Sequence, residues 1–200
     1  MKLPYSILCL LFVVSALYAC KEDVKTESES QAVEKIVVEE PAGDTARKES
    51  ISQANSVMAR IMGTKECKSY ARYIVSAEIS DKLLKEEGPF TVFAPSEEAF
   101  NSMDATLVNN LTKTENKPQL MLMVKSHIVK GSHDSVSLIQ ALKNGTVSLT
   151  SLSGEQLTVS RKDNDIVVTD SKGNAATVGK SDIQANNGVV HVVNSVLGTN

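Results

Sequence analysis

Aromatic residues are scarce in this 200-residue chain, which has no tryptophan, four tyrosines and four phenylalanines. Tyr5, Phe12 and Tyr18 lie in an apolar amino-terminal segment, and the phenylalanines that remain are expected to fill the core. Only Tyr70 and Tyr73 are left for stacking against a ligand. The composition therefore argues against a carbohydrate-binding platform, which depends on exposed rings.

Several patterns that carry chemistry are also missing. The sequence has no G-x-S-x-G, no glycine-rich phosphate loop, no HExxH and no paired-cysteine spacing. It has no block of lysine or arginine, and its net charge is only −3, which argues against nucleic acid as a partner. We therefore expect no enzyme, no metal site and no cofactor.

The amino end carries the pattern of an export signal. Lys2 precedes an apolar run of 13 residues, Ile7 to Ala19, which is shorter than the roughly 20 residues that a membrane-spanning helix needs. Leu17-Tyr18-Ala19-Cys20 resembles a bacterial lipobox. This resemblance implies removal of residues 1–19 and acylation of Cys20, with palmitate among the chains, so that lipid on Cys20 holds the protein at a membrane. The alternative is an ordinary signal peptide with Cys20 unmodified.

The residues after Cys20 bear on location. Lys21-Glu22-Asp23 resembles the signals that send some Gram-negative lipoproteins to the outer face of the outer membrane, although a solvated charge cluster would look the same. We expect an outer membrane lipoprotein of the cell envelope, and the sequence leaves open whether it faces the periplasm or the cell surface. Residues 20–49 hold few apolar side chains and many charges, which predicts a disordered tether.

Residues 50–200 are long enough for one domain with a real core, and they show no internal repeat. Helical spacing or caps predict helices near 54–62, 71–78, 80–87, 96–100, 118–124 and 135–143. Short β-rich segments predict strands at 90–94, 146–150, 157–159, 165–169 and 189–197. A helical first half followed by a β-rich second half predicts an α+β fold.

Two segments of this domain carry a family resemblance. Residues 88–100, Gly-Pro-Phe-Thr-Val-Phe-Ala-Pro-Ser-Glu-Glu-Ala-Phe, resemble the first signature of the fasciclin domain. Residues 187–197, Asn-Gly-Val-Val-His-Val-Val-Asn-Ser-Val-Leu, resemble the second. The resemblance covers about residues 50–197 and implies a compact wedge, or sandwich, of short strands with several helices packed along it. Most residues of both signatures are expected to be core.

The resemblance also supplies candidate contact residues. Asp182-Ile183 stands where family members often carry an Asp-Ile pair, and His127 stands in the family's Tyr-His segment, where Ser126 replaces the tyrosine. In animal fasciclin domains these elements are integrin contacts. The resemblance thus implies binding through Asp182, Ile183 and His127. The alternative is that Asp182 caps a turn while Ile183 packs.

These observations favour a membrane-anchored lipoprotein whose single fasciclin-like domain mediates cell adhesion or binds a protein or matrix polymer of unknown identity. One alternative is a carrier for a small apolar ligand, in a pocket lined by methionines 58, 62, 121 and 123. An enzyme is a weaker alternative, and it requires His127 or His191 beside a carboxylate and a nucleophile. His127, His133, His191 and Asp134 could in principle form a metal site, but hydrogen-bonded core histidines are the favoured interpretation.

Overall fold

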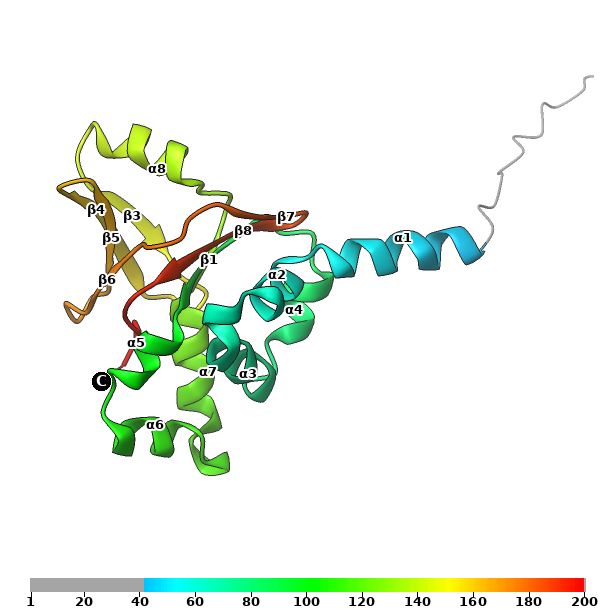
Figure 1. Cartoon of the computed structure of the whole chain (residues 1–200), viewed down its shortest axis with the longest axis horizontal. Coiled ribbons are helices and arrows are strands. Elements are labelled where there is room, and N and C mark those ends of the chain that lie inside the picture. Colours follow the sequence, from blue (N-terminus) through cyan, green and yellow to red (C-terminus); the bar gives the residue numbers. More distant parts are fainter. Residues whose placement is uncertain (1–41, 200) are drawn as a thin grey trace, which may run out of the picture. The chain divides into compact units, whose positions relative to one another are not determined.

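A computed structural model of the chain describes residues 42–199 (Figure 1). The predicted signal segment, Cys20 and the predicted tether up to residue 41 therefore lie outside the described residues. The described residues belong to one compact unit. No helix within the described range is both long and apolar enough to cross a membrane.

The first half is helical, as predicted. Its helices are α1 (Ala42–Ala54), α2 (Val57–Gly63), η1 (Lys65–Cys67), α3 (Lys68–Ser76), α4 (Ser80–Lys85), α5 (Glu97–Asn101), α6 (Ala105–Leu111), η2 (Thr114–Asn116) and α7 (Lys117–Ser126). One more helix, α8 (Ser135–Leu142), lies further along the chain. Helix α6 was not predicted, although Asp104 caps it by accepting from the backbone N–H groups of Thr106 and Leu107.

Two features of the helical half differ from the sequence prediction. Residues 42–49, the end of the predicted tether, are helical in α1, and every described side chain from 44 to 50 is exposed. Met62 and Val75 were predicted to face inward but are 63% and 55% exposed. In α2 the buried face is Val57, Met58 and Ile61, so the next position along the helix points outward.

The first sheet joins the two sequence signatures. Its strands are β1 (Phe90–Pro95), β2 (Ile128–Lys130), β7 (Ile183–Ala185) and β8 (Gly188–Val193), in the order β2-β1-β8-β7. The pairing of β1 with β8 is parallel, whereas β1–β2 and β7–β8 are antiparallel. Strand β8 is central, as predicted, but it ends at Val193, four residues before the predicted end.

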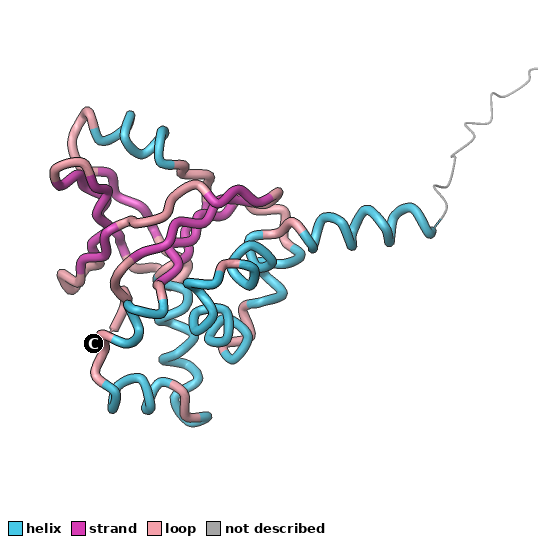
Figure 2. The backbone as a smooth tube through the Cα atoms, viewed as in Figure 1, coloured by secondary structure: helices cyan, strands magenta, loops and turns pink. Residues whose placement is uncertain are grey.

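The second sheet is an antiparallel meander in the order β3-β4-β5-β6. Its strands are β3 (Val147–Thr150), β4 (Gln156–Lys162), β5 (Asp165–Thr169) and β6 (Ala175–Thr177). An isolated bridge between Val129 and Ser151 links it to β2, and another between Val178 and Val193 links it to β8. The two sheets are therefore linked by these bridges, and the strands of both are coloured magenta in Figure 2.

The first sheet separates two hydrophobic clusters. The first fills the space between the first sheet and helices α2, α3, α4 and α7, and includes Val92, Val190 and Tyr70. The second lies between the two sheets and under α8, and includes Phe93, Leu138 and Leu157. Successive residues of β1 and β8 point to opposite faces, so each signature strand contributes side chains to both clusters.

Local chemistry explains the strand-to-helix turn of the first signature. Ser96 adopts an extended backbone, and its hydroxyl accepts from the N–H of Ala99, which makes it the N-cap of α5 as predicted. Ser80 was also predicted to be a cap but is the first residue of α4, and no side chain caps that helix. At the start of β8 a Cβ on Gly188 would collide with the carbonyl oxygen of Phe90, so only glycine fits there.

Candidate functional site

Asp182, one of the three candidate contact residues, lies in the loop between β6 and β7, and its carboxylate reaches the start of α8. Its Oδ1 accepts from the backbone N–H of Ser135 at 2.8 Å, and its Oδ2 accepts from the hydroxyls of Ser135 and Ser181. Partial burial opposes ionisation, but the hydrogen bonds from Ser135 outweigh it and lower the pKa of Asp182. Asp182 is thus a charged anchor for the amino end of α8.

His191 connects the same loop to the centre of the first sheet. Its ring is fully buried and stacks on Phe93, with 5.6 Å between the ring centroids. Nδ1 accepts from the N–H of Asp182 at 3.4 Å, which leaves Nε2 to donate to the carbonyl of His133 at 2.8 Å. Burial lowers the pKa of His191. The neutral ring therefore joins the β2–α8 loop to the β6–β7 loop.

Thr91, in β1, holds the β2–α8 loop through its hydroxyl group. Its hydroxyl donates to the carbonyl of Gly131 at 2.7 Å and accepts from the N–H of His133 at 2.9 Å. Both loops are thus tied to neighbouring strands of the first sheet, one through Thr91 and the other through His191. These ties give the surface around Asp182 a defined geometry.

Ile183 does not share a surface with the Asp182 carboxylate. It pairs with Val190 in the β7–β8 ladder and packs, half-buried, against the first hydrophobic cluster. The Asp182 carboxylate is bound to α8, which lies over the second cluster. The packing predicted for Ile183 in the alternative interpretation is therefore present, and the prediction that these two residues contact a partner stays a prediction.

Two exposed apolar side chains lie on α8, the helix whose first residue is hydrogen-bonded to Asp182. Val136 is 61% exposed and Ile139 is 37% exposed, and their i, i+3 spacing puts them on one side of the helix. The opposite side packs inward through Leu138. We call Asp182, Val136 and Ile139 the α8 face. Sequence reasoning missed its two aliphatic residues, although apolar residues on two sides of one helix are a signal for a second contact.

His127 is buried, and both of its ring nitrogens are hydrogen-bonded. The N–H of Leu197 donates to its Nε2 at 2.9 Å, so Nδ1 carries the proton and donates to the carbonyl of Met123 at 2.8 Å. Burial lowers the pKa of His127 from 6.5 to about 4. The neighbouring Ser126 hydroxyl lies 3.3 Å from the carbonyl oxygen of Leu197. In this conformation His127 holds the carboxyl-terminal segment and has no surface to offer a partner.

Asp170, which sequence reasoning also missed, holds the same segment. Its carboxylate accepts from the backbone N–H groups of Lys172, Asn174 and Gly198, and from the Asn174 side chain. Burial opposes ionisation, yet these hydrogen bonds lower the pKa of Asp170. We call Ser126, His127 and Asp170 the carboxyl-terminal clamp.

The arrangement does not reproduce a catalytic or metal site. Ser135 bonds to Asp182 rather than to a histidine, and both ring nitrogens of His191 are used by backbone groups. Within residues 42–199 no three His, Cys, Asp or Glu side chains are grouped so as to hold a metal. The geometry required by the enzyme alternative is therefore not present around either His127 or His191.

The methionine pocket of the apolar-carrier alternative is not present either. Met58 and Met123 are buried in the first cluster, Met121 packs against it and Met62 is exposed, so the four side chains line no common cavity.

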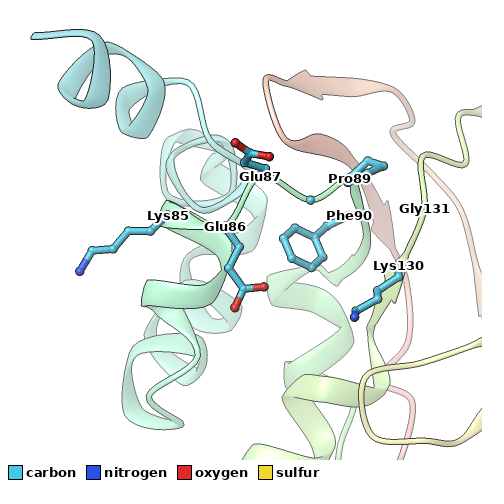
Figure 3. Close-up of a pocket in the computed structure, with 8 residues that line it drawn as sticks. Lys85, Glu86, Glu87, Pro89, Phe90, Lys130 and Gly131 are labelled. Atoms are coloured by element: carbon cyan, nitrogen blue, oxygen red, sulfur yellow. The ribbon is translucent and has the colours of Figure 1, made fainter. Parts of the chain in front are cut away.

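A depression of about 480 Å³ does lie at the start of β1, between the end of α4 and the end of β2. Figure 3 shows the Phe90 ring between the side chains of Glu86 and Lys130. Lys85 and Glu86 at its rim are paired with Asp81 and Lys82.

Comparison with known proteins gives a family match over most of the domain. The model of the fasciclin domain matches residues 65–199. The Synechocystis protein sll1483 is 33% identical over 76% of this chain and 81% of its own length.

Animal proteins match over a smaller share of their own length. Transforming growth factor-beta-induced protein ig-h3 of Sus scrofa is 34% identical over 71% of this chain, which corresponds to 19% of that protein. Human periostin is 29% identical over 63% of this chain and 14% of its own length.

The fold also matches a solved structure. A FAS1 domain pair from the insect cell adhesion molecule fasciclin I is superimposable with a TM-score of 0.56 and 24% sequence identity, over 66% of this chain and 45% of that one. This likeness concerns the fold alone.

Proposed function

Because the chain belongs to the fasciclin domain family, we propose that it is an adhesion or binding module held at a membrane by lipid on Cys20. The matched family is one of adhesion-type domains rather than a family of enzymes, and its relatives include extracellular and cell-surface proteins. The family match over residues 65–199 carries the adhesion part of this proposal, and the resemblance of residues 17–20 to a lipobox supports the anchor. The partner is a protein or matrix polymer outside the cytoplasm.

The α8 face is the proposed contact surface. Val136 and Ile139 supply exposed aliphatic area, and Asp182 supplies a fixed negative charge at the same end of the helix. Exposed apolar residues beside a charge are typical of protein contact surfaces. Because Asp182, Thr91 and His191 hold the loops in place, little conformational entropy is lost when a partner binds.

An attachment assay on the native cells tests the contact surface. We expect deletion of the gene to reduce attachment, and re-expression of the protein to restore it. The double substitution Val136→Asp with Ile139→Asp places charge on the α8 face and should fail to restore attachment. Leu122→Asp is the matched control, because Leu122 is a similarly exposed aliphatic residue on another helix, α7.

The outcomes of this assay are distinct. If the deletion strain attaches and forms biofilm normally, and the purified fasciclin domain (the head) retains no partner, the adhesion proposal is wrong. If the deletion reduces attachment but the double substitution restores it as well as Leu122→Asp does, the function stands and the contact surface lies elsewhere. Thermal unfolding of each variant confirms that the head remains folded.

The anchor has its own experiment. Incorporation of labelled palmitate should be detected in the native protein and abolished by Cys20→Ala. Protease accessibility on intact cells then distinguishes a surface-facing head from a periplasmic one. Unmodified Cys20 in the native protein would contradict the anchoring proposal and leave the adhesion assay valid.

A further inference from the structure

One surface of the helical half carries exposed apolar and cationic side chains together. Lys68, Arg72 and Val75 are exposed on α3 at i, i+4 and i+7, which aligns them along one side of the helix. Met62 of α2 lies alongside, because Met62, Lys68 and Arg72 line one depression of about 360 Å³. Exposed Lys65 lies three residues before Lys68, in η1. We call these five residues the basic strip.

The cations of the strip are not neutralised by neighbouring carboxylates. Among residues 42–199, none of Lys65, Lys68 and Arg72 belongs to an ion pair. Arg72 donates through Nη2 to the Ser69 hydroxyl at 2.8 Å. The strip therefore presents positive charge to the solvent.

Two acidic residues, Glu66 and Glu97, bear on the charge of the strip. Glu97 lines the same depression, but its carboxylate accepts from the backbone N–H of Ser69 at 2.5 Å and from the Ser69 hydroxyl at 2.9 Å. Glu66 lies 3.8 Å from Lys180. Glu97 keeps its negative charge and offsets one cation, but the strip has three cations and Glu66 lies beside a further one, so the surface stays net positive and its natural complement is an anionic partner.

We propose that the basic strip is a docking surface for an anionic lipid bilayer. Cations attract acidic headgroups, and apolar side chains between them enter the boundary with the acyl chains. Met62 and Val75 are single exposed side chains on helix surfaces rather than the walls of a deep cleft, which suits a broad, soft partner. This inference goes beyond the proposed adhesion and uses residues outside the α8 face.

The position of the strip in the chain fits such a partner. Helices α2 and α3 directly follow α1 and are the first elements of the core after the proposed tether. A strip of this size binds a bilayer weakly on its own. The proposed tether would keep the strip close to the bilayer. This closeness raises the effective lipid concentration to about the millimolar range, which makes weak docking significant. The proposed anchor is needed for this last step only.

Vesicle flotation with residues 40–200 tests the docking directly. This segment contains both hydrophobic clusters in one compact unit and carries no lipid. We expect binding to vesicles of phosphatidylcholine mixed with phosphatidylglycerol, loss of that binding at high salt, and no binding to phosphatidylcholine alone. The double substitution Lys68→Glu with Arg72→Glu should reduce the partition coefficient about tenfold or more. Met62→Ser should reduce it about threefold.

A charge-matched control separates the strip from net charge. Lys130→Glu with Lys143→Glu changes the net charge equally at exposed positions outside the strip, and it should retain most of the binding. Equal losses in the two double variants, or equal binding to neutral vesicles, would overturn the proposal. If a peptide of residues 21–41 binds the strip while vesicles do not, the strip is a contact within the chain and the lipid proposal is wrong. Failure here leaves the attachment assay of the α8 face unaffected.

Discussion

The buried ring of His127 makes the stability of the head depend on pH. Both ring nitrogens are satisfied only in the neutral form, since Nε2 must accept from the N–H of Leu197 while Nδ1 donates to Met123. A second proton on Nε2 would face an N–H group and place a charge in the interior. The folded state therefore resists protonation, whereas the unfolded chain does not.

The size and sign of the effect follow from the two pKa values of His127. Burial lowers the folded pKa from 6.5 to about 4. Between these values the unfolded state binds more protons, so the free energy of unfolding falls as the pH falls. The expected loss is about 2 kcal/mol from pH 7.5 to pH 5, and about 3 kcal/mol once the pH is below 4. His191, whose pKa is also lowered, contributes in the same direction.

Urea unfolding at several pH values measures this loss. Asp170, Asp182 and Glu98 have pKa values below their usual 3.8, 3.8 and 4.5, so their contributions are lost in stronger acid and leave the window from about pH 7.5 to about pH 5 to the histidines. His127→Gln offers an amide that can donate and accept at similar positions but does not titrate. We expect its stability to fall by about 2 kcal/mol less than that of the wild type between pH 7.5 and pH 5.

A direct titration of the His127 ring can contradict this argument. If NMR of the folded protein shows the His127 ring becoming protonated near pH 6.5, the argument from burial is wrong. The same conclusion follows if His127→Gln folds and shows the pH dependence of the wild type. His191→Gln, examined in parallel, separates the contribution of the second buried ring.

Three further substitutions test other contacts by urea unfolding. Gly188→Ala should lower the free energy of unfolding by about 2 kcal/mol or more, because its Cβ meets the Phe90 carbonyl; a smaller loss would mean that the strands separate easily. Asp182→Ala should lower it by about 1–2 kcal/mol through loss of the hydrogen bonds from Ser135, and Asp182→Asn, which keeps one acceptor and tolerates the positive φ of 59°, should lose less. Tyr70→Phe should lower it by about 1 kcal/mol, because a buried helix carbonyl loses the hydroxyl donor 3.1 Å away; an unchanged stability would argue against that hydrogen bond.

Elements with strong local signals were predictable from the sequence. The first signature was assigned as a strand, a turn and a helix capped by Ser96, because proline, alternating apolar residues and a cap all act within a few positions. Strands β6 and β7 have three residues each, too few to show a period, and neither was predicted. For β7 the Asn186-Asn187 pair that joins it to β8 was an unused turn signal.

The side to which a residue points and the residues that it contacts depend on tertiary structure, which one sequence does not display. Val75 fits a helical apolar pattern yet faces outward, because α3 buries the side that contains Tyr70 and Ile74. Likewise, nothing local indicates that His191 will hold a loop through Asp182, nine residues earlier in the chain. The candidate residue Asp182 was identified from the family resemblance, whereas its role at the start of α8 required the fold.

The parallel pairing of β1 with β8 limits when the first sheet can fold during synthesis of the chain. Residues 90–95 find their central neighbour only at residues 188–193, and the carboxyl-terminal clamp closes later still, at Leu197 and Gly198. A chain that emerges amino end first from a ribosome cannot complete its first sheet until residues 188–193 have emerged. Strand β1 therefore stays without its central neighbour while the whole intervening segment is synthesised.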